Sequence, residues 1–276
     1  LRVAVPSRVA WAAFYADCVH RLEPIASGYR LALVYNLVRH SRGPRPKPPD
    51  RREAVKALTG FLQKWSRAPA AASSPEKLIA ILDHHYTPAG LSFGSLKNRD
   101  AATVAALTQA AADAKCVCHL AMVSISESGS ADGLGDYDSE DDYDVIEVDD
   151  RRQQLDGWIA PPGRTCVLDA SIPFHLSEVS PPGAIDEEAP DEQHFTEATG
   201  NEGGSFERTY RRAGLVIWPR ARELKIIAHS GAPVALPYLA KLLDDAASEA
   251  IAEGFARDVI AHWRNAHALG YAFDPE

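Results

Sequence analysis

Alternating side chains in the first forty residues place the strongest constraint on the fold. Residues 9–16 follow the period of two that is typical of a β-strand. A second short strand is expected over Cys18–Leu22, and Pro24–Gly28 has the composition of a turn. Tyr29–Val38 is rich in Leu, Val and Tyr and predicts a third strand. Three adjoining strands predict an antiparallel meander or the edge of a barrel.

The next segment has helical signals. Four prolines make Ser41–Asp50 a linker, and the carboxylate of Asp50 suits a helix N-cap. The helix that follows has an apolar stripe formed by Val55, Leu58, Phe61, Leu62 and Trp65. Ser73–Glu76 has the spacing of a capping box and predicts a second helix start. A further helix is expected from Asp100 to Lys115, and a strand from Cys116 to Ser126.

The second half begins with polar sequence. Glu127–Asp150 is rich in acids, Gly and Ser, which predicts a solvated or disordered loop. The stretch Pro161–Gln193 has little periodicity beyond a short strand at 165–168. Regular structure is expected again in a buried strand at Arg211–Pro219 and in helices at Ala235–Asp245 and Ser248–Ala268.

His20 and Arg30 are the residues with the clearest chemical potential. If the chain folds back about Ile25, these two positions face each other across a hairpin, with Cβ atoms about 5 Å apart. An imidazole and a guanidinium would then point into one cavity. Ferrous oxygenases bind iron through two His and one carboxylate. An Arg can bind the distal carboxylate of a keto-acid co-substrate through two parallel hydrogen bonds.

The run His20-x-x-x-Pro24-x-x-x-Gly28-x-Arg30 resembles the distal half of prolyl-4-hydroxylase-like iron(II)/2-oxoglutarate dioxygenases. The resemblance implies that His20 is the distal iron ligand and that Arg30 binds 2-oxoglutarate. It therefore implies Fe(II) as cofactor, and 2-oxoglutarate and O₂ as co-substrates. The expected reaction is hydroxylation of a substrate, for which a protein side chain is one candidate.

The resemblance extends to a bacterial and fungal subfamily through four later segments, which are Leu82–Ser92, Asp136–Asp150, Thr199–Gly203 and Tyr210–Pro219. It implies an α+β chain that begins with the C-terminal part of a double-stranded β-helix (jelly-roll), followed by an α/β extension and a helical C-terminus. The expected divisions are 1–40 for the jelly-roll strands, 41–126 for a linker and extension, 127–195 for acidic and Pro-rich loops, and 196–276 for a strand and helices.

One departure from the family concerns the other iron ligands. The family has a His-x-Asp or His-x-Glu motif upstream of the distal His, and none of the ten His here begins such a motif. Nineteen residues before His20 are too few for the strands that would bear it. With no initiator Met at Leu1, the expectation is that the motif lies upstream and that this fragment alone is inactive.

Several polar residues have alternative interpretations. Arg30 could instead pair with Glu23 or Asp17. Adjacent His84 and His85 point about 100° apart on a helix, which favours hydrogen bonding over metal binding. The acids at 136–150 lack the Gly and Glu of an EF-hand loop. Arg211 and Arg212 are expected to pair with Glu207 or with the acidic loop rather than to bind an external anion.

Composition limits the partners. A formal charge of −9 argues against sequence-independent nucleic-acid binding, and no apolar run is long enough for a membrane span. Cys18, Cys116, Cys118 and Cys166 are few, and reduced thiols indicate a cytoplasmic protein. The competing function is a non-catalytic protein-interaction module, in which the acidic loop and helical tail are the working surface on a residual jelly-roll.

Overall fold

The structure is a computed structural model. It describes residues 11–13, 21, 24–35, 50–68, 75–133, 143–166, 168–185, 189–199, 203–244 and 248–268. The chain divides into two compact units, Leu1–Asp50 and Arg51–Glu276, and each is considered by itself.

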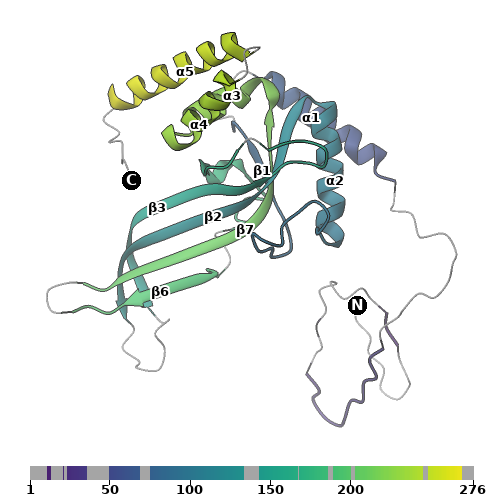
Figure 1. Ribbon diagram of the computed structural model, residues 1–276. Helices are drawn as coiled ribbons and strands as arrows, with labels where there is room; N and C mark the ends of the chain where they lie inside the picture. Colours follow the sequence, from purple (N-terminus) through teal and green to yellow (C-terminus); the bar gives the residue numbers. More distant parts are fainter. Residues whose placement is uncertain are drawn as a thin grey trace. The chain divides into compact units, whose positions relative to one another are not determined.

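A seven-stranded sheet forms the centre of the second unit (Figure 1). The strand order is β4-β3-β2-β7-β1-β5, and β6 pairs with residues 205–209 at the N-terminal end of β7. All pairs are antiparallel except β1 with β5. The strands are β1 (Leu78–Ile81), β2 (Cys116–Gly133), β3 (Tyr143–Ile159), β4 (Ile172–Pro173), β5 (Val179–Ser180), β6 (Glu192–Thr196) and β7 (Ser205–Pro219).

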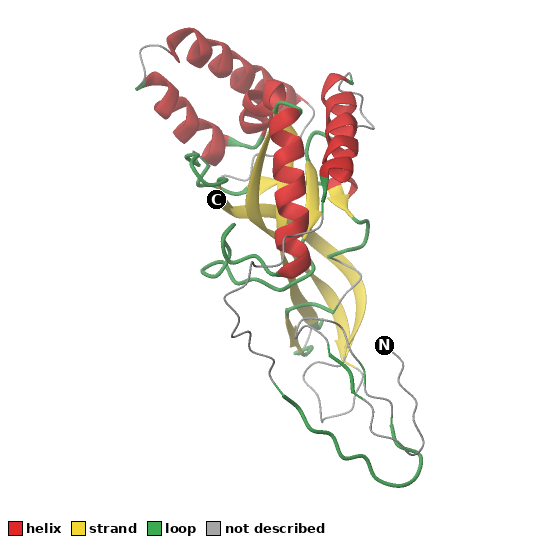
Figure 2. Cartoon of the chain, turned by 90° about the vertical axis from the view of Figure 1, so that its right-hand side faces the viewer, coloured by secondary structure: helices red, strands yellow, loops and turns green. Residues whose placement is uncertain are grey.

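Helices cover both faces of the sheet at one end, and the long strands continue past them (Figures 1 and 2). The α-helices are α1 (Arg52–Arg67), α2 (Asn98–Asp113), α3 (Glu223–His229), α4 (Ala232–Leu243) and α5 (Glu249–Ala268). Short 3₁₀ turns occur at Leu176–Glu178 and Arg220–Arg222. No helix in the described part of the chain combines the length and the apolar character that crossing a bilayer requires.

Two hydrophobic cores lie on opposite faces of the sheet, because successive side chains of a strand point to opposite sides. Val117, Val123 and Trp218 pack with side chains of α3, α4 and α5. Cys118 and Leu215 lie on the other face, with side chains of α1 and α2. β2 and β7 contribute to both cores, so they form the partition between the two helical layers.

Most of the expected helices are present. α1 buries Leu62 and Trp65 of the predicted stripe, although Phe61 is exposed. α2, α4 and α5 lie where the sequence patterns predicted helices, and β7 includes the predicted strand at Arg211–Pro219. The mixed α+β class is therefore confirmed, and the jelly-roll portion stays a prediction.

Three expectations for the second unit are wrong. Of the short strand expected at 165–168, residues 165, 166 and 168 are described, and they are not in a strand. The capping-box pattern at Ser73–Glu76 is followed by strand β1 rather than by a helix. Residues 127–133 and 143–150, expected to form a solvated loop, belong to the antiparallel ladder between β2 and β3. Polar side chains are compatible with a strand here because the two segments pair with each other through their backbones. Composition alone does not reveal this pairing.

The expected strand at Tyr29–Val38 is not formed by residues 29–35, and the remaining positions lie outside the described residues. Tyr29, Leu31 and Val34 are highly exposed, at 105%, 91% and 89%. A strand needs a neighbour for its backbone hydrogen bonds, and none of the described segments pairs with residues 24–35. Of the strands expected at 9–16 and 18–22, only residues 11–13 and 21 are described, and these are not in strands.

Candidate functional site

The predicted iron ligand His20 lies outside the described residues, so its position relative to Arg30 stays a prediction. Arg30 is described and exposed. The chain bends at residues 26–28, where Gly28 has a φ of 85°. This conformation is favoured by glycine and suits a turn between positions 20 and 30.

The segment after β1 is attached to the first turn of α2 through Asp100, which is 2% exposed. Its carboxylate accepts backbone N–H groups of Asp83 and His84 at 2.8 and 3.1 Å. His84 Nδ1 and the Tyr86 hydroxyl lie 2.8 and 2.9 Å from Asp100 Oδ2. Burial acts to raise the pKa of Asp100, but these hydrogen bonds outweigh burial and the pKa is lowered. His84 thus has a hydrogen-bonding role.

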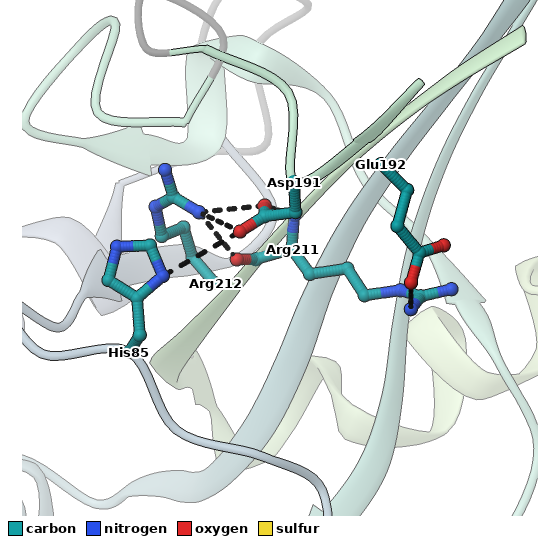
Figure 3. A network of polar contacts seen from close by, with 5 residues as sticks. All are labelled: His85, Asp191, Glu192, Arg211 and Arg212. Carbon is teal, nitrogen blue, oxygen red and sulfur yellow. Dashed lines mark hydrogen bonds and ion pairs between the residues drawn. The ribbon is translucent and has the colours of Figure 1, made fainter. Parts of the chain in front are cut away.

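Asp191, immediately before β6, is the centre of a second polar network (Figure 3). Arg212 Nη1 donates to both carboxylate oxygens, at 2.8 and 3.1 Å, and to the Arg211 carbonyl oxygen at 2.7 Å. The Arg211 backbone N–H donates to Asp191 Oδ2 at 2.6 Å. His85 Nδ1 approaches Asp191 Oδ1 to 3.6 Å. The Arg211 side chain points away, toward Glu192 at 2.9 Å.

This network joins two of the later segments on which the resemblance to the dioxygenase subfamily is based. His85 belongs to Leu82–Ser92, Arg212 belongs to Tyr210–Pro219, and the carboxylate of Asp191 lies between them. The arginines therefore have intramolecular partners, as expected, and among the described residues these include Glu192 for Arg211 and Asp191 for Arg212. Asp191 was missed because it lies in a Pro- and acid-rich stretch without periodicity, 21 residues from Arg212.

The Asp191 network fits a structural role better than a catalytic one. Arg212 is 5% exposed, and the two oxygens of Asp191 already accept hydrogen bonds from Arg212 and the Arg211 backbone. A carboxylate occupied in this way has little capacity left for a substrate or a metal ion. Of the two cationic or ring side chains that approach the Asp191 carboxylate, His85 is the exposed one, with 64% of its side chain accessible against 5% for Arg212.

A contact between buried His119 and half-buried Cys166 occurs on the face covered by α3, α4 and α5. His119 Nδ1 lies 3.8 Å from Cys166 Sγ, and its ring contacts Trp158 and Trp218. Burial, assisted by the positive charge of Arg164, lowers the pKa of His119 to about 4. Burial also raises the pKa of the Cys166 thiol. These shifts favour the neutral forms of both groups over the thiolate–imidazolium pair of an activated cysteine nucleophile.

Other buried charges serve the fold. Glu127 on β2 lies between Arg151 of β3, at 3.1 Å, and Arg208 of β7. Lys77 and Glu178 form a buried pair at 3.0 Å. Cys116 and Cys118 are buried free thiols whose pKa values are raised by burial, as expected for core cysteines. Within the described ranges, no three His, Cys, Asp or Glu side chains are grouped as a metal site would require.

Comparisons of the chain with known protein families, with curated proteins and with solved structures found no match. The structure itself defines the class of the protein, which is α+β with a seven-stranded sheet between two helical layers.

Proposed function

We propose that the chain is part of an iron(II)/2-oxoglutarate-dependent dioxygenase, in which His20 is the distal iron ligand and Arg30 binds the co-substrate. The observation that carries this proposal is the pattern His20-x-x-x-Pro24-x-x-x-Gly28-x-Arg30. The bend at residues 26–28 and the positive φ of Gly28 support it, because a hairpin that faces His20 toward Arg30 requires a turn at this point.

The residues of this chain fit the co-substrate better than they fit the metal. The Arg30 guanidinium can hold a distal carboxylate through two parallel hydrogen bonds. The iron requires two His and one carboxylate, and His20 would be one of these three ligands. Iron with 2-oxoglutarate and O₂ would supply the oxidising power for hydroxylation. A protein side chain is the proposed substrate class, and the unit Arg51–Glu276 would accompany the catalytic domain.

An iron site of this kind requires a His-x-Asp or His-x-Glu motif upstream of Leu1. The first test is therefore the coding sequence before this position. An intact upstream reading frame without such a motif would refute the oxygenase.

The second test is calorimetry on the extended protein with Mn(II) and 2-oxoglutarate. His20→Ala should abolish metal binding. Arg30→Ala should weaken 2-oxoglutarate binding by at least tenfold and leave metal binding within about threefold, since one charge-assisted bidentate pair is lost. Arg21→Ala, which changes a neighbouring exposed Arg, is the matched control and should bind both ligands normally. Equal loss of both ligands in Arg30→Ala would indicate a structural role for Arg30.

We also propose a second function, protein interaction, because one observation favours it specifically. Residues 144–152 of β3 are all exposed, although they form part of the ladder with β2. A strand with this exposure at the edge of a sheet is suited to contact another chain. The test is hydrogen exchange of the backbone amides of residues 144–150 in the full chain. Fast exchange is expected for an open edge, and slow exchange without a partner would refute this function.

A further inference from the structure

The outer side of β3 has an open edge, defined here as residues 144–150. β4 covers β3 only at Gln154 and Leu155. No strand among the described segments pairs with residues 144–150 on the side away from β2. Figure 1 shows β3 at the margin of the sheet, with the helices at the other end of the strands. Alternate residues of such an edge direct their backbone N–H and C=O groups outward, where another strand can pair with them.

Apolar side chains accompany these backbone groups. Val145, Ile146 and Val148 are 38%, 62% and 40% exposed. Isolated exposed apolar residues are common on protein surfaces, but here three lie within four positions of one edge strand. They offer contacts to the side chains of a strand that pairs with the open edge.

Two irregularities set the shape of this edge. The register between β2 and β3 shifts at Ser128/Gly129 and at Ser130/Ala131, so Asp149 and Ile146 have no directly opposed residue on β2. Such bulges increase local twist and are frequent at sheet edges, where they hinder unspecific pairing with flat strands. The open edge therefore favours a short, twisted partner over an extended sheet.

Charge decides which partner fits. Residues 136–150 contain nine acids and no Lys or Arg. Asp144, Glu147, Asp149 and Asp150 belong to the open edge itself. Two copies paired antiparallel along this edge would bring acids against acids, and like charges directly opposite destabilise a strand pair. A partner rich in Lys or Arg would instead form favourable cross-strand pairs. The negative potential of the edge would also attract such a partner as it approaches.

We propose that the open edge of β3 binds an extended, Lys/Arg-rich segment of another protein by strand addition. Main-chain hydrogen bonds to residues 144–150 provide affinity, and the acids select basic side chains. This inference rests on the second proposed function and is independent of the oxygenase.

The proposed interaction has a defined end. A groove of about 340 Å³ lies where β4 separates from β3, and its lining includes Arg152, Gln153 and His175. The Phe174 N–H donates to the Gln153 carbonyl at 3.2 Å, so the chain of β4 takes over the edge at this point. A docked strand must therefore stop near Arg152, whose guanidinium lies 2.9 Å from Asp150.

The test uses the full chain and a fluorescein-labelled nine-residue peptide of alternating Lys and Val. Fluorescence anisotropy should show saturable binding, and hydrogen exchange of amides in residues 144–150 should slow in the complex. The same peptide methylated at its backbone nitrogens keeps its charge but cannot donate to the edge. Its affinity should be at least tenfold lower. A peptide with Glu in place of Lys should not bind.

The variant Glu147→Lys/Asp149→Lys should bind the Lys peptide at least tenfold more weakly. The matched control is Asp244→Lys/Glu253→Lys, which makes the same charge change on exposed positions of the helical layer and should stay within twofold. Circular dichroism checks that both variants fold, and the peptide comparisons on the unmodified protein do not depend on them.

Several results would overturn the proposal. Equal binding of the methylated peptide would show that charge alone acts, without strand addition. Equal binding by Glu147→Lys/Asp149→Lys would place the peptide elsewhere. A dimer that this variant dissociates would identify a second copy as the occupant. Absence of Lys-peptide binding to the full chain would refute the selection of basic segments by this edge.

Discussion

Asp100 Oδ2 lies 2.8 Å from His84 Nδ1, although the two residues are 16 positions apart in the chain. The same carboxylate oxygen accepts the Tyr86 hydroxyl, and the Tyr86 oxygen in turn accepts the Lys97 backbone N–H at 2.9 Å. One buried acid thereby connects the segment after β1 with the start of α2. This explains how a loop of low periodicity is held in one conformation between a central strand and a helix.

Asp100→Ala should lower the free energy of unfolding by about 3 kcal/mol, because several hydrogen-bond donors lose their buried, charged acceptor. Denaturant unfolding at pH 7 measures the change. Asp83→Ala is the control, since Asp83 and Arg99 form an exposed ion pair and the backbone N–H of residue 83 is retained. The control should lose less than about 1 kcal/mol. Similar losses in both variants would contradict the role assigned to Asp100.

His119 should make the protein less stable in mild acid. Its pKa is about 4 in the folded chain, against an ordinary value of 6.5, chiefly because it is buried. The unfolded chain therefore binds the proton first as the pH falls. Above pH 6.5 the free energy of unfolding contains the full contribution of neutral His119. Between pH 6.5 and about pH 4 this contribution to the free energy of unfolding is lost, by about 3 kcal/mol in total.

His119→Phe keeps an aromatic ring against Trp158 and Trp218 and should remove this part of the pH dependence. Urea unfolding at pH 7.5 and pH 5 should show wild type losing about 2 kcal/mol more than the variant over this interval. His194→Phe, at an exposed position of β6, should behave as wild type. Identical pH dependence of wild type and His119→Phe would disprove the assignment.

The buried pair of Lys77 and Glu178 should be sensitive to loss of one partner. Lys77→Met should destabilise the protein by about 3 kcal/mol, because Glu178 would keep an uncompensated charge at 3% exposure. The double variant Lys77→Met/Glu178→Gln should recover part of this loss, since the neutral amide can still accept the His175 backbone N–H. Thermal and denaturant unfolding measure both changes. Lys225→Met breaks an exposed pair with Glu76 and should cost less than about 1 kcal/mol.

Gly129 occupies a position in β2 where no side chain fits. A Cβ there would lie 2.0 Å from the Glu147 carbonyl oxygen. Gly129→Ala should separate β2 from β3 at the bulge and destabilise the protein by about 2 kcal/mol. Gly60→Ala lies in α1 with no atom near the new Cβ and should stabilise by about 0.5–1 kcal/mol. Opposite signs in denaturant unfolding are expected for these two Gly→Ala changes.

Elements with a strong intrinsic pattern were predictable from the sequence. α1 has an apolar stripe that places Leu62 and Trp65 in the core, and α5 likewise buries Phe255 and Val259. The apolar run in β7 is buried on both faces, as a central strand requires. α1 and α5 have an apolar stripe because each contacts one side of the sheet, and the C-terminal part of β7 has an apolar run because this part is completely buried. Both patterns are visible in a short stretch of sequence.

Elements that depend on distant partners were not predictable. Residues 144–152 of β3 are exposed, so their composition resembles that of a solvated loop, and only the ladder with β2 makes them a strand. β1 follows a helix-like capping signal, yet it pairs with β7 and β5. In the Asp191 network, no local spacing predicts that His85 and Arg212 share this carboxylate.

β7 separates β1 from β2 in the sheet although it follows both in the chain. During synthesis from the N-terminus, the hairpin of β2 and β3 can form from neighbouring sequence. β1 and β2 obtain their common neighbour only when residues 205–219 have left the ribosome. Until then, neither hydrophobic layer is complete, and nascent chains that end before Ser205 should be bound by chaperones that recognise exposed apolar strands.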